Sequence, residues 1–188
     1  MSVSEVATIV EGHGDLEAVS ILIRKVAESL DASRTVKMPI ELRSSKGRMR
    51  NEQAFLKSLE IVRRYVGSGG SVLVIMDADK DCPKEINEQL TQWAKKAHAD
   101  LSVAVVVAKR EMEAWFIAGS AHWNKDEHGD AESVRDPKNW VAKNIVKGHY
   151  AETVDQARMA ANLDIEKARE ARSFGKFARD VTRLLSKG

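Results

Sequence analysis

Stretches of mostly apolar residues recur along the chain without regular alternation. They cover residues 6–10, 72–76 and 103–108, and each is too short to form a helix of ordinary length. Unbroken apolar runs of this length are typical of strands that are buried on both faces of a parallel sheet. We predict a further strand over residues 36–42, where Pro39 favours a place at the sheet edge or an irregular start.

Between the predicted strands, apolar residues recur every three or four positions, which is the spacing of an amphipathic helix. The pattern predicts helices over residues 16–30, 55–66 and 86–97, and a further one over about residues 110–118. Strands and helices therefore alternate through the first two thirds of the chain. Alternation with short connections predicts an α/β fold with a mainly parallel four-stranded sheet and right-handed crossovers.

The last third of the chain has a different pattern, because no segment in it resembles a strand. Residues 119–139 are polar and predicted to be irregular, whereas apolar spacing predicts helices near residues 154–161 and 174–184. Neither helix carries enough apolar surface to stand alone. We therefore expect an α/β domain over residues 1–118 and a helical extension over residues 119–188, packed together as one globular unit.

Composition narrows the class of protein. The 188 residues are 43% hydrophobic and 31% charged, which is ordinary for a globular protein. No apolar stretch reaches the roughly 20 residues that span a bilayer, and the N-terminus lacks the pattern of an export signal. We therefore expect a cytoplasmic protein without membrane association. Cys82 is the only cysteine, which excludes an internal disulfide.

The net charge of +2 conceals an uneven distribution of charge. Residues 1–134 contain 18 basic and 21 acidic side chains, whereas residues 135–188 contain 12 basic and 7 acidic side chains. An acidic site beside a basic flank suits a metal-dependent enzyme that acts on a polyanion. A solvated helical surface accounts for the same counts, and the counts alone favour it.

Carboxylates follow two of the predicted buried strands. Glu11 ends the first apolar run, and Asp77 and Asp79 follow the run over residues 72–76. The carboxyl ends of parallel strands meet at one edge of a sheet, where open α/β sheets place their sites. Acids at positions i and i+2 of an extended backbone point the same way, so we expect Asp77 and Asp79 to share a cation. Because crowded carboxylates repel one another, the pattern predicts a hard divalent metal ion.

The residues around these acids have two interpretations. Gly12 leaves room for a metal ion or a phosphate to approach the backbone beside Glu11, and His13 is the one histidine placed to touch such a site. An ordinary turn between a strand and a helix, capped by Asp15, explains the same residues. Asp81 either supplies a further metal ligand or caps the helix that follows it.

A glutamate–glycine pair at Glu11 and an Asp-x-Asp motif at Asp77 and Asp79 resemble the TOPRIM domain in their order and in their placement after predicted strands. TOPRIM domains are the catalytic modules of topoisomerases, bacterial primases, recombination-mediator proteins and OLD-family nucleases. This resemblance covers roughly residues 6–118. It implies a Rossmann-like TOPRIM fold for that part of the chain.

A closer resemblance extends over the whole chain. Residues 11–15, 46–47, 77–82, 109–115 and 172–174 are similar to a bacterial family of small stand-alone TOPRIM-like proteins of unassigned function. Relatives of that family occur among phage-defence and mobile-element genes. The resemblance implies a fold and a metal site, and it leaves the reaction open.

The resemblance also implies a role for each acid. Glu11 is expected to act as general acid and base at the metal site, while Asp77 and Asp79 bind Mg²⁺ or Mn²⁺. Without a metal ion, a glutamate beside two aspartates should have a raised pKa. OLD-like nucleases bring additional acids for a second metal ion, so we expect a ligand from Glu111 or Glu113. These two side chains would lie about 200° apart on a helix, so at most one should face the site.

Basic residues supply candidate contacts to nucleic acid. Four of them lie within eight residues that contain no acid: Arg43, Lys46, Arg48 and Arg50. Lys109, at the end of a predicted strand, and Arg172, in the late helical region, extend this set. Side chains of this kind bind the phosphate backbone. A merely solvated loop explains the run over residues 43–50 nearly as well.

The leading hypothesis is a Mg²⁺- or Mn²⁺-dependent nuclease that hydrolyses phosphodiester bonds in DNA or RNA, in phage defence or DNA repair. A second hypothesis is a noncatalytic or partner-dependent nucleic-acid-binding module. ATPases often drive nucleases of this kind, so an ATPase or another subunit encoded in the same operon is a candidate partner. A third is a phosphohydrolase of the haloacid-dehalogenase type, in which Asp77 would attack phosphorus. That type has Thr or Val where this chain has Asp81, and its nucleophile follows the first strand, so the sequence disfavours it.

Overall fold

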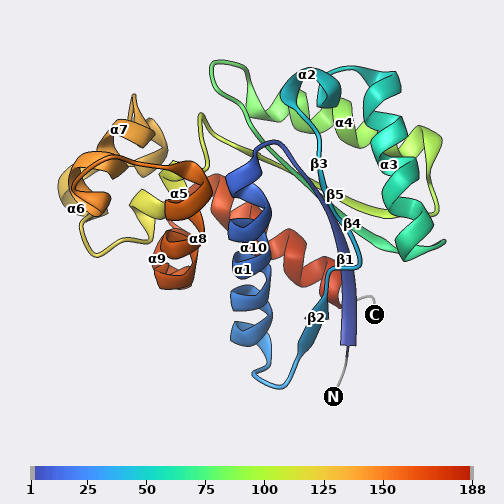
Figure 1. The fold of residues 1–188 in the computed structure, drawn as a ribbon, viewed down its shortest axis with the longest axis horizontal. Helices are drawn as coiled ribbons and strands as arrows, with labels where there is room; N and C mark the ends of the chain where they lie inside the picture. The colour runs from blue at the N-terminus through green and yellow to red at the C-terminus, as the bar shows by residue number, and fades with distance from the viewer. Residues whose placement is uncertain (1–2, 187–188) are drawn as a thin grey trace.

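Five parallel strands form the centre of the protein, whose computed structural model describes residues 3–186 (Figure 1). The strands are β1 (Val3–Val10), β2 (Thr35–Lys37), β3 (Glu41–Arg43), β4 (Ser71–Asp77) and β5 (Ser102–Ala108). Their order is β2–β1–β4–β5, and β3 also pairs with β1. Because every pair is parallel, the carboxyl ends of all strands lie at one edge of the sheet.

The outer strand differs from the prediction. In place of one strand over residues 36–42, the chain forms β2 and β3, which pair with the beginning and the end of β1. Pro39 lies between them and has no N–H group to donate to the ladder. In the described part of the chain the sheet therefore has five strands where the sequence predicts four, because its edge strand is divided.

Helices cover both faces of the sheet. The long ones are α1 (His13–Leu30), α3 (Glu52–Val66), α4 (Pro83–Ala97) and α10 (Arg172–Leu185). Helices α1 and α10 pack on one face, and α3 and α4 pack on the other (Figure 1). The fold is thus α/β with a parallel sheet between two helical layers, as the alternation of strands and helices in the sequence predicts.

Shorter elements surround the end of the sheet. They are α2 (Lys46–Met49), α5 (Glu113–Ala118), α6 (Lys125–His128), a 3₁₀ helix (Ala131–Ser133), α7 (Pro137–Val141), a π-helical turn (Ala142–Val146), α8 (Glu152–Asn162) and α9 (Ile165–Ala168). The predicted basic loop therefore contains a helical turn, and the region predicted to be irregular contains short helices. The helix predicted from about residue 110 begins at Glu113. No helix within residues 3–186 combines the length and the apolar character that crossing a membrane requires.

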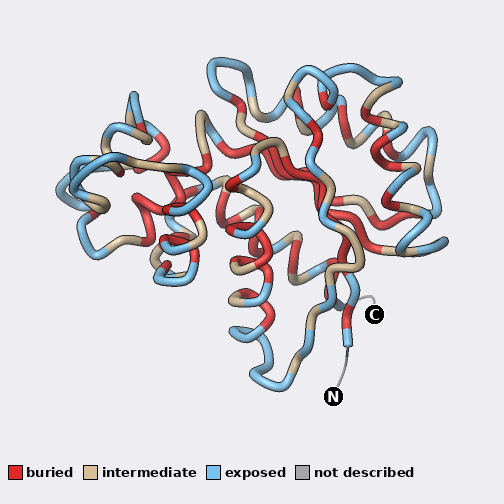
Figure 2. The backbone as a smooth tube through the Cα atoms, in the orientation of Figure 1, coloured by how far each residue is buried: buried red, intermediate tan, exposed pale blue. Residues whose placement is uncertain are grey.

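Two hydrophobic cores lie on the two faces of the sheet, which explains the unbroken apolar runs. Along β4, Leu73 and Ile75 face the core under α1 and α10, whereas Val74 and Met76 face the core under α3 and α4. Figure 2 shows the central strands as a continuous buried region. The rigid centre of the molecule therefore fixes where each strand ends.

Helix α10 belongs to the layers around the sheet although it comes last in the chain. Phe174, Phe177 and Val181 recur on one side of the helix, and all three are buried. Trp115 of α5 packs edge-on against Phe174 and donates its indole N–H to Ser173 Oγ at 2.7 Å. The late helices and the sheet thus share one core, which brings residues beyond position 119 next to the carboxyl edge.

Candidate functional site

Two of the predicted acids meet at the carboxyl edge of the sheet. Val10 pairs with Ile75 in the parallel register of β1 and β4, so Glu11 leaves β1 beside the end of β4. Glu11 Oε2 accepts a hydrogen bond from the Asp77 backbone N–H at 3.3 Å. Asp77 Oδ1 accepts a hydrogen bond from the Met112 N–H at 3.0 Å. The sheet therefore joins acids that are 66 residues apart in the sequence.

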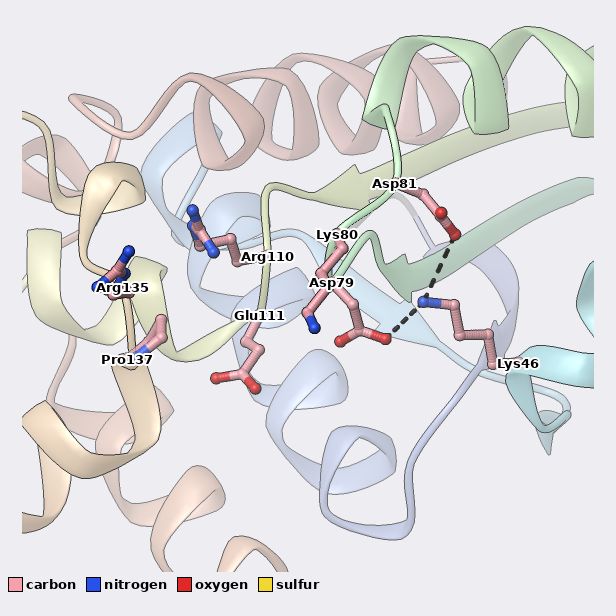
Figure 3. Close-up of a pocket in the computed structure, with 8 residues that line it drawn as sticks. All are labelled: Lys46, Asp79, Lys80, Asp81, Arg110, Glu111, Arg135 and Pro137. Carbon is pink, nitrogen blue, oxygen red and sulfur yellow. Dashed lines mark hydrogen bonds and ion pairs between the residues drawn. The ribbon is translucent and has the colours of Figure 1, made fainter.

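Asp79 is engaged by a lysine, contrary to the expectation that it shares a cation with Asp77. Strand β4 ends at Asp77, and Asp79 has a left-handed backbone with φ of 51°, so the two side chains do not share one side of a strand. Asp79 Oδ2 instead lies 2.5 Å from Lys46 Nζ, and the Asp79 side chain is 51% exposed. Figure 3 marks this ion pair with a dashed line. Asp77 and Asp79 are therefore not a preformed pair of ligands for one cation.

The loops after β4 and β5 share an unusual backbone conformation. Arg110 also has a positive φ, 63°, and its carbonyl oxygen accepts the Asp79 N–H at 2.9 Å. A left-handed backbone at a residue other than glycine is uncommon and costs roughly 1–2 kcal/mol. Two such residues joined by a hydrogen bond at a sheet edge favour a functional explanation for the conformation.

Glu113 is the most deeply buried acid at this edge. It begins α5, has 0% relative exposure, and accepts hydrogen bonds at Oε1 from the Tyr150 hydroxyl at 2.6 Å and from Gln156 Nε2 at 3.2 Å. Its other oxygen, Oε2, is buried and has no hydrogen-bond partner among the described residues. A buried carboxylate oxygen without a partner is costly, so this atom indicates a place for a positive ligand.

Glu111 and Glu113 both contribute to the site, contrary to the expectation that at most one of them faces it. Glu111 precedes the first turn of α5, so the angle expected on a helix does not apply. Glu111 lines an open cleft together with Asp79, and its Oε2 is also buried without a partner among the described residues. Lys138 Nζ lies 3.9 Å from Glu111 Oε1 and 2.7 Å from Glu152 Oε1. Lys138, which belongs to α7 and not to the sheet, thus lies next to these acids.

Asp77 lies at the centre of the negative charge. Burial raises the pKa of Asp77 well above the ordinary carboxyl range, and the charges of Glu113, Asp15 and Glu11 raise it further. The charge of Lys138 acts in the opposite direction and does not cancel the increase. The acids therefore repel one another in surroundings that already disfavour a charged carboxylate.

Glu11 has a raised pKa, in the direction expected for a glutamate beside two aspartates without a metal ion. Burial is the largest cause, and the charges of Asp79 and Asp15 add to it. The Asp77 N–H and the charge of Lys46 lower the pKa in part. The main reason is therefore desolvation of the carboxylate, with repulsion between acids second.

Asp15 belongs to the acid cluster, although the sequence suggested it only as a helix cap. Helix α1 begins at His13, so its N-cap is Gly12, whose N–H donates to Asp15 Oδ2 at 2.7 Å. A Cβ added to Gly12 would lie 2.8 Å from that oxygen, which explains a glycine here. Burial raises the pKa of Asp15. His13 is exposed, and its ring makes no hydrogen bond to the described residues.

We call the five buried or partly buried acids at this edge the acidic site. They are Glu11, Asp15, Asp77, Glu111 and Glu113. Burial is the largest cause that raises the pKa of each. The acidic site thus stores unfavourable electrostatic energy, which a bound cation would relieve.

Two of the predicted basic residues are engaged by the loop after β4. Lys46 contacts Asp79 and lies 3.9 Å from Asp81 Oδ2, while Arg50 lies 3.5 Å from the same oxygen. Asp81 is therefore an ion-pair partner and does not cap α4, whose N-cap is Cys82. These contacts neutralise Asp79 and Asp81 from the side of α2.

The other predicted contacts to nucleic acid lie in different places. Arg43 ends β3 and Arg48 lies in α2, and both are exposed. Lys109 and Arg172 line a separate cleft beside α10. The structure therefore does not unite the predicted basic residues in one surface.

The open cleft has a volume of about 470 Å³ and exposes part of the acidic site. Its lining residues are Lys46, Asp79, Lys80, Asp81, Arg110, Glu111, Arg135 and Pro137. Figure 3 shows Arg110 and Arg135 on the side of the cleft that is away from Lys46, with Asp79 and Glu111 between them. Basic residues thus flank acids in a cleft that is wide enough for a phosphate group.

The acidic site suits a divalent cation in its chemistry but has no ready-made geometry for one. Within residues 3–186, no three His, Cys, Asp or Glu side chains stand where they would hold a metal ion together. Carboxylate oxygens are the donors that Mg²⁺ and Mn²⁺ prefer, and Glu111 and Glu113 each offer a buried oxygen without a partner. The residues therefore fit such an ion once side chains rearrange.

A family match covers almost the whole chain. The model of a family described as a domain of unknown function, DUF4276, matches residues 10–182. The chain belongs to the DUF4276 family. No solved structure matches this chain. The matched residues include the complete acidic site and most of α10, so the DUF4276 region contains both the sheet edge and the helices around it.

In this DUF4276 protein, three side chains of the site come from α7, α8 and the loop between them, a region that no sequence pattern places beside the acids. They are Lys138, Tyr150 and Gln156. None belongs to a recognisable motif, and their contacts depend on how α7 and α8 pack. One residue in the sequence, Gly14, relates to this packing. A Cβ added to it would lie 2.6 Å from the Glu152 carbonyl oxygen, so a glycine there lets α1 and α8 approach closely.

Proposed function

We propose that this protein is a Mg²⁺- or Mn²⁺-dependent nuclease of the TOPRIM type that hydrolyses phosphodiester bonds of DNA or RNA. The observation that carries the proposal is the convergence of Glu11, Asp77 and Glu113, whose pKa values are all raised by burial. Acids held together at such a cost require a positive partner. Lys46 and Lys138 border the acids and offset their charge only in part.

The resemblance to the TOPRIM domains of OLD-family nucleases supports the proposal. In that resemblance, a glutamate and an aspartate follow different strands and act together. Here Glu11 and Asp77 follow β1 and β4, which are neighbours in a parallel sheet. This arrangement is what joint action of the two residues requires.

The proposed ligands are Asp77, Glu113 and Glu11, with Glu111 and Asp79 at the open cleft. A bound divalent ion would offset the charge that develops on the phosphoryl oxygens. Glu11, whose pKa is raised, is suited to exchange a proton with a water molecule or a leaving hydroxyl group. The Asp77 N–H holds one oxygen of Glu11, which orients the other oxygen for this exchange.

One observation favours a second function, a nucleic-acid-binding module without catalysis. Lys46 lies 2.5 Å from Asp79, where a second cation ligand was expected, and no group of three metal ligands is preformed in residues 3–186. A lysine in that place neutralises an acid that would otherwise be available to a cation. This alternative predicts nucleic-acid binding that does not depend on metal ions.

Cleavage assays separate the two functions. The purified protein is incubated with linear duplex, nicked duplex and single-stranded DNA, and with RNA, in Mg²⁺, Mn²⁺ or EDTA. We expect cleavage that requires the metal ion and falls at least about 100-fold in Glu11→Gln and in Asp77→Asn. Asparagine keeps an acceptor for the Met112 N–H, so the second variant removes charge with little change of shape.

Asp100→Asn is the matched control, because Asp100 pairs with Arg63 at 2.8 Å outside the acidic site. It should cleave like the wild-type protein. Equal cleavage by the wild type and by both site variants would reveal a contaminating nuclease and contradict the proposal. Metal-independent binding without any turnover would establish the second function instead.

A further inference from the structure

A second cleft beside α10 is strongly basic. It has a volume of about 650 Å³, and within residues 3–186 it is lined by six basic and two acidic side chains. The basic residues are Lys84, Lys109, Arg169, Arg172, Lys176 and Arg179. We call this the basic cleft.

Both acids of the basic cleft are already used by the protein. Glu132 is 1% exposed, and its carboxylate accepts the N–H groups of Arg172 at 3.1 Å and Ser173 at 3.0 Å, at the start of α10. Asp130 Oδ1 accepts the Glu132 N–H at 2.9 Å, and Asp130 Oδ2 lies 3.6 Å from Lys109 Nζ. These acids shape the wall of the cleft. Lys84, Lys109, Arg169 and Lys176 each pair with an acid, so among the described residues the positive charge left unbalanced is that of Arg172 and Arg179.

Arg172 and Arg179 are the basic residues most available to a ligand. Among the described residues, neither takes part in an ion pair. Arg172 is the first residue of α10, where the helix dipole disfavours a positive charge, so its position has no stabilising explanation within the helix. Arg179 Nη1 lies 3.4 Å from the place that a Cβ of Gly175 would occupy, so the arginine extends over a bare stretch of helix.

The basic cleft adjoins the open cleft of the acidic site. After β4, Asp81 lines the open cleft and the next residue, Cys82, lines the basic cleft. After β5, Lys109 lines the basic cleft and the next residue, Arg110, lines the open cleft. The loops after β4 and β5 therefore line both clefts. An elongated anion that lies in one cleft reaches the other across these loops.

We propose that the basic cleft holds the sugar–phosphate backbone of the nucleic acid that extends from the acidic site, an inference that rests on the proposed function. The charge of the cleft matches a chain of phosphates. Among the described residues that line it, none is aromatic, so the cleft offers no platform for stacking bases. The contacts are therefore to the backbone and independent of base sequence.

Binding is measured in EDTA, so that the result does not depend on cleavage. The probes are a short fluorescein-labelled DNA duplex, its single strand and the RNA strand of the same sequence, titrated at several salt concentrations. We expect Arg172→Gln and Arg179→Gln each to weaken binding of the preferred probe about tenfold. Each should also lower the slope of log affinity against log salt by about 1, whatever the base sequence.

Lys95→Gln is the control, because Lys95 is exposed at the opposite end of α4 from the basic cleft. It should leave affinity and slope unchanged. Arg172→Gln should not lower the thermal midpoint, so weaker binding cannot be attributed to unfolding. Binding lost in the two arginine variants supports the inference even if the wild type never cleaves, which would contradict the proposed function alone.

Three results would overturn the inference. The first is wild-type affinity in both arginine variants while Lys95→Gln binds equally well. The second is a wild-type protein that binds none of the three probes at low salt. The third is binding to vesicles of phosphatidylserine and phosphatidylcholine that depends on Arg172 and Arg179 while the nucleic-acid probes do not bind, which would assign the cleft to a membrane surface.

Discussion

The acidic site and the basic cleft lie side by side at one edge of the sheet, yet the protein balances their charges differently. In the basic cleft, the fold uses both acids: Glu132 holds the start of α10, and Asp130 pairs with Lys109. In the acidic site, Glu113 keeps one oxygen without a partner among the described residues, and Asp77 is crowded by other carboxylates.

This difference indicates which charges the protein itself supplies and which it leaves to a ligand. Structural charges are paired within the fold, as Glu132 is with backbone N–H groups. The charges left over are negative in the acidic site and positive in the basic cleft. We infer that a nucleic acid together with a divalent cation supplies both missing partners.

The largest expected effect concerns the acidic site, where Glu113→Gln should weaken the binding of a divalent cation. Glutamine keeps the size of the side chain and removes the negative charge. We expect the affinity for Mn²⁺ to fall at least about 100-fold, because loss of a group that merely orients a metal ligand already costs roughly 10–100-fold. Isothermal titration calorimetry measures the affinity, with Glu60→Gln on α3 as the control. Unchanged affinity in Glu113→Gln would exclude this residue from the metal site.

A second test concerns the packing that holds the acidic site together. An added Cβ at Gly14 would lie 2.6 Å from the Glu152 carbonyl oxygen, so Gly14→Ala must push α1 away from α8. We expect a loss of about 2–3 kcal/mol in the free energy of unfolding, measured with denaturant. Gly47→Ala is the control, since no atom lies within 4 Å of its added Cβ. Similar stability of both variants would show that the close approach is unimportant.

A third test compares charge removal in the two regions. Without metal ions, Asp77→Asn removes a carboxylate that burial and neighbouring acids disfavour, so we expect the free energy of unfolding to rise by about 1 kcal/mol. Asp100→Asn should lower it slightly, because the hydrogen bond from Arg63 lowers the pKa of Asp100. Thermal unfolding in EDTA measures both. A destabilised Asp77→Asn protein would show that the charge of Asp77 is compensated within the fold.

The smallest expected effect is a dependence of stability on pH. Acids with raised pKa values stabilise the fold below the ordinary carboxyl pKa of about 4, and this contribution is lost as pH rises through the raised values. In EDTA, the thermal midpoint should therefore fall by a few degrees between mildly acidic and neutral pH, and less in Asp77→Asn. Saturating Mn²⁺ should abolish the decrease. If the thermal midpoint depended equally on pH in the wild type and in Asp77→Asn, Asp77 would not be the source of the dependence.

The sequence predicts the sheet and the meeting of Glu11 with Asp77 because both depend on strand patterns that are local. It does not predict that Asp79 pairs with Lys46, because the left-handed backbone at Asp79 ends the extended segment after β4. The i and i+2 rule holds only while the backbone stays extended. A turn of one residue is invisible in the apolar pattern.

The residues that complete the site could not be predicted for a different reason. Lys138, Tyr150 and Gln156 reach the acids only because α7 and α8 pack beside α1 and α5. Such packing depends on contacts between distant segments, for which the chain carries no motif. The edge strand is different, because Pro39 already predicts an edge position or an irregular start for that strand.

The most direct test of the account is a calorimetric titration of the wild-type protein with Mn²⁺ in two buffers of different ionisation enthalpy, at mildly acidic pH. Because Asp77 and its neighbours have raised pKa values, binding of the cation should release protons, and the measured heat should differ between the buffers. Asp77→Asn should bind more weakly and release fewer protons. A wild-type protein that takes up no divalent cation would contradict the central claim.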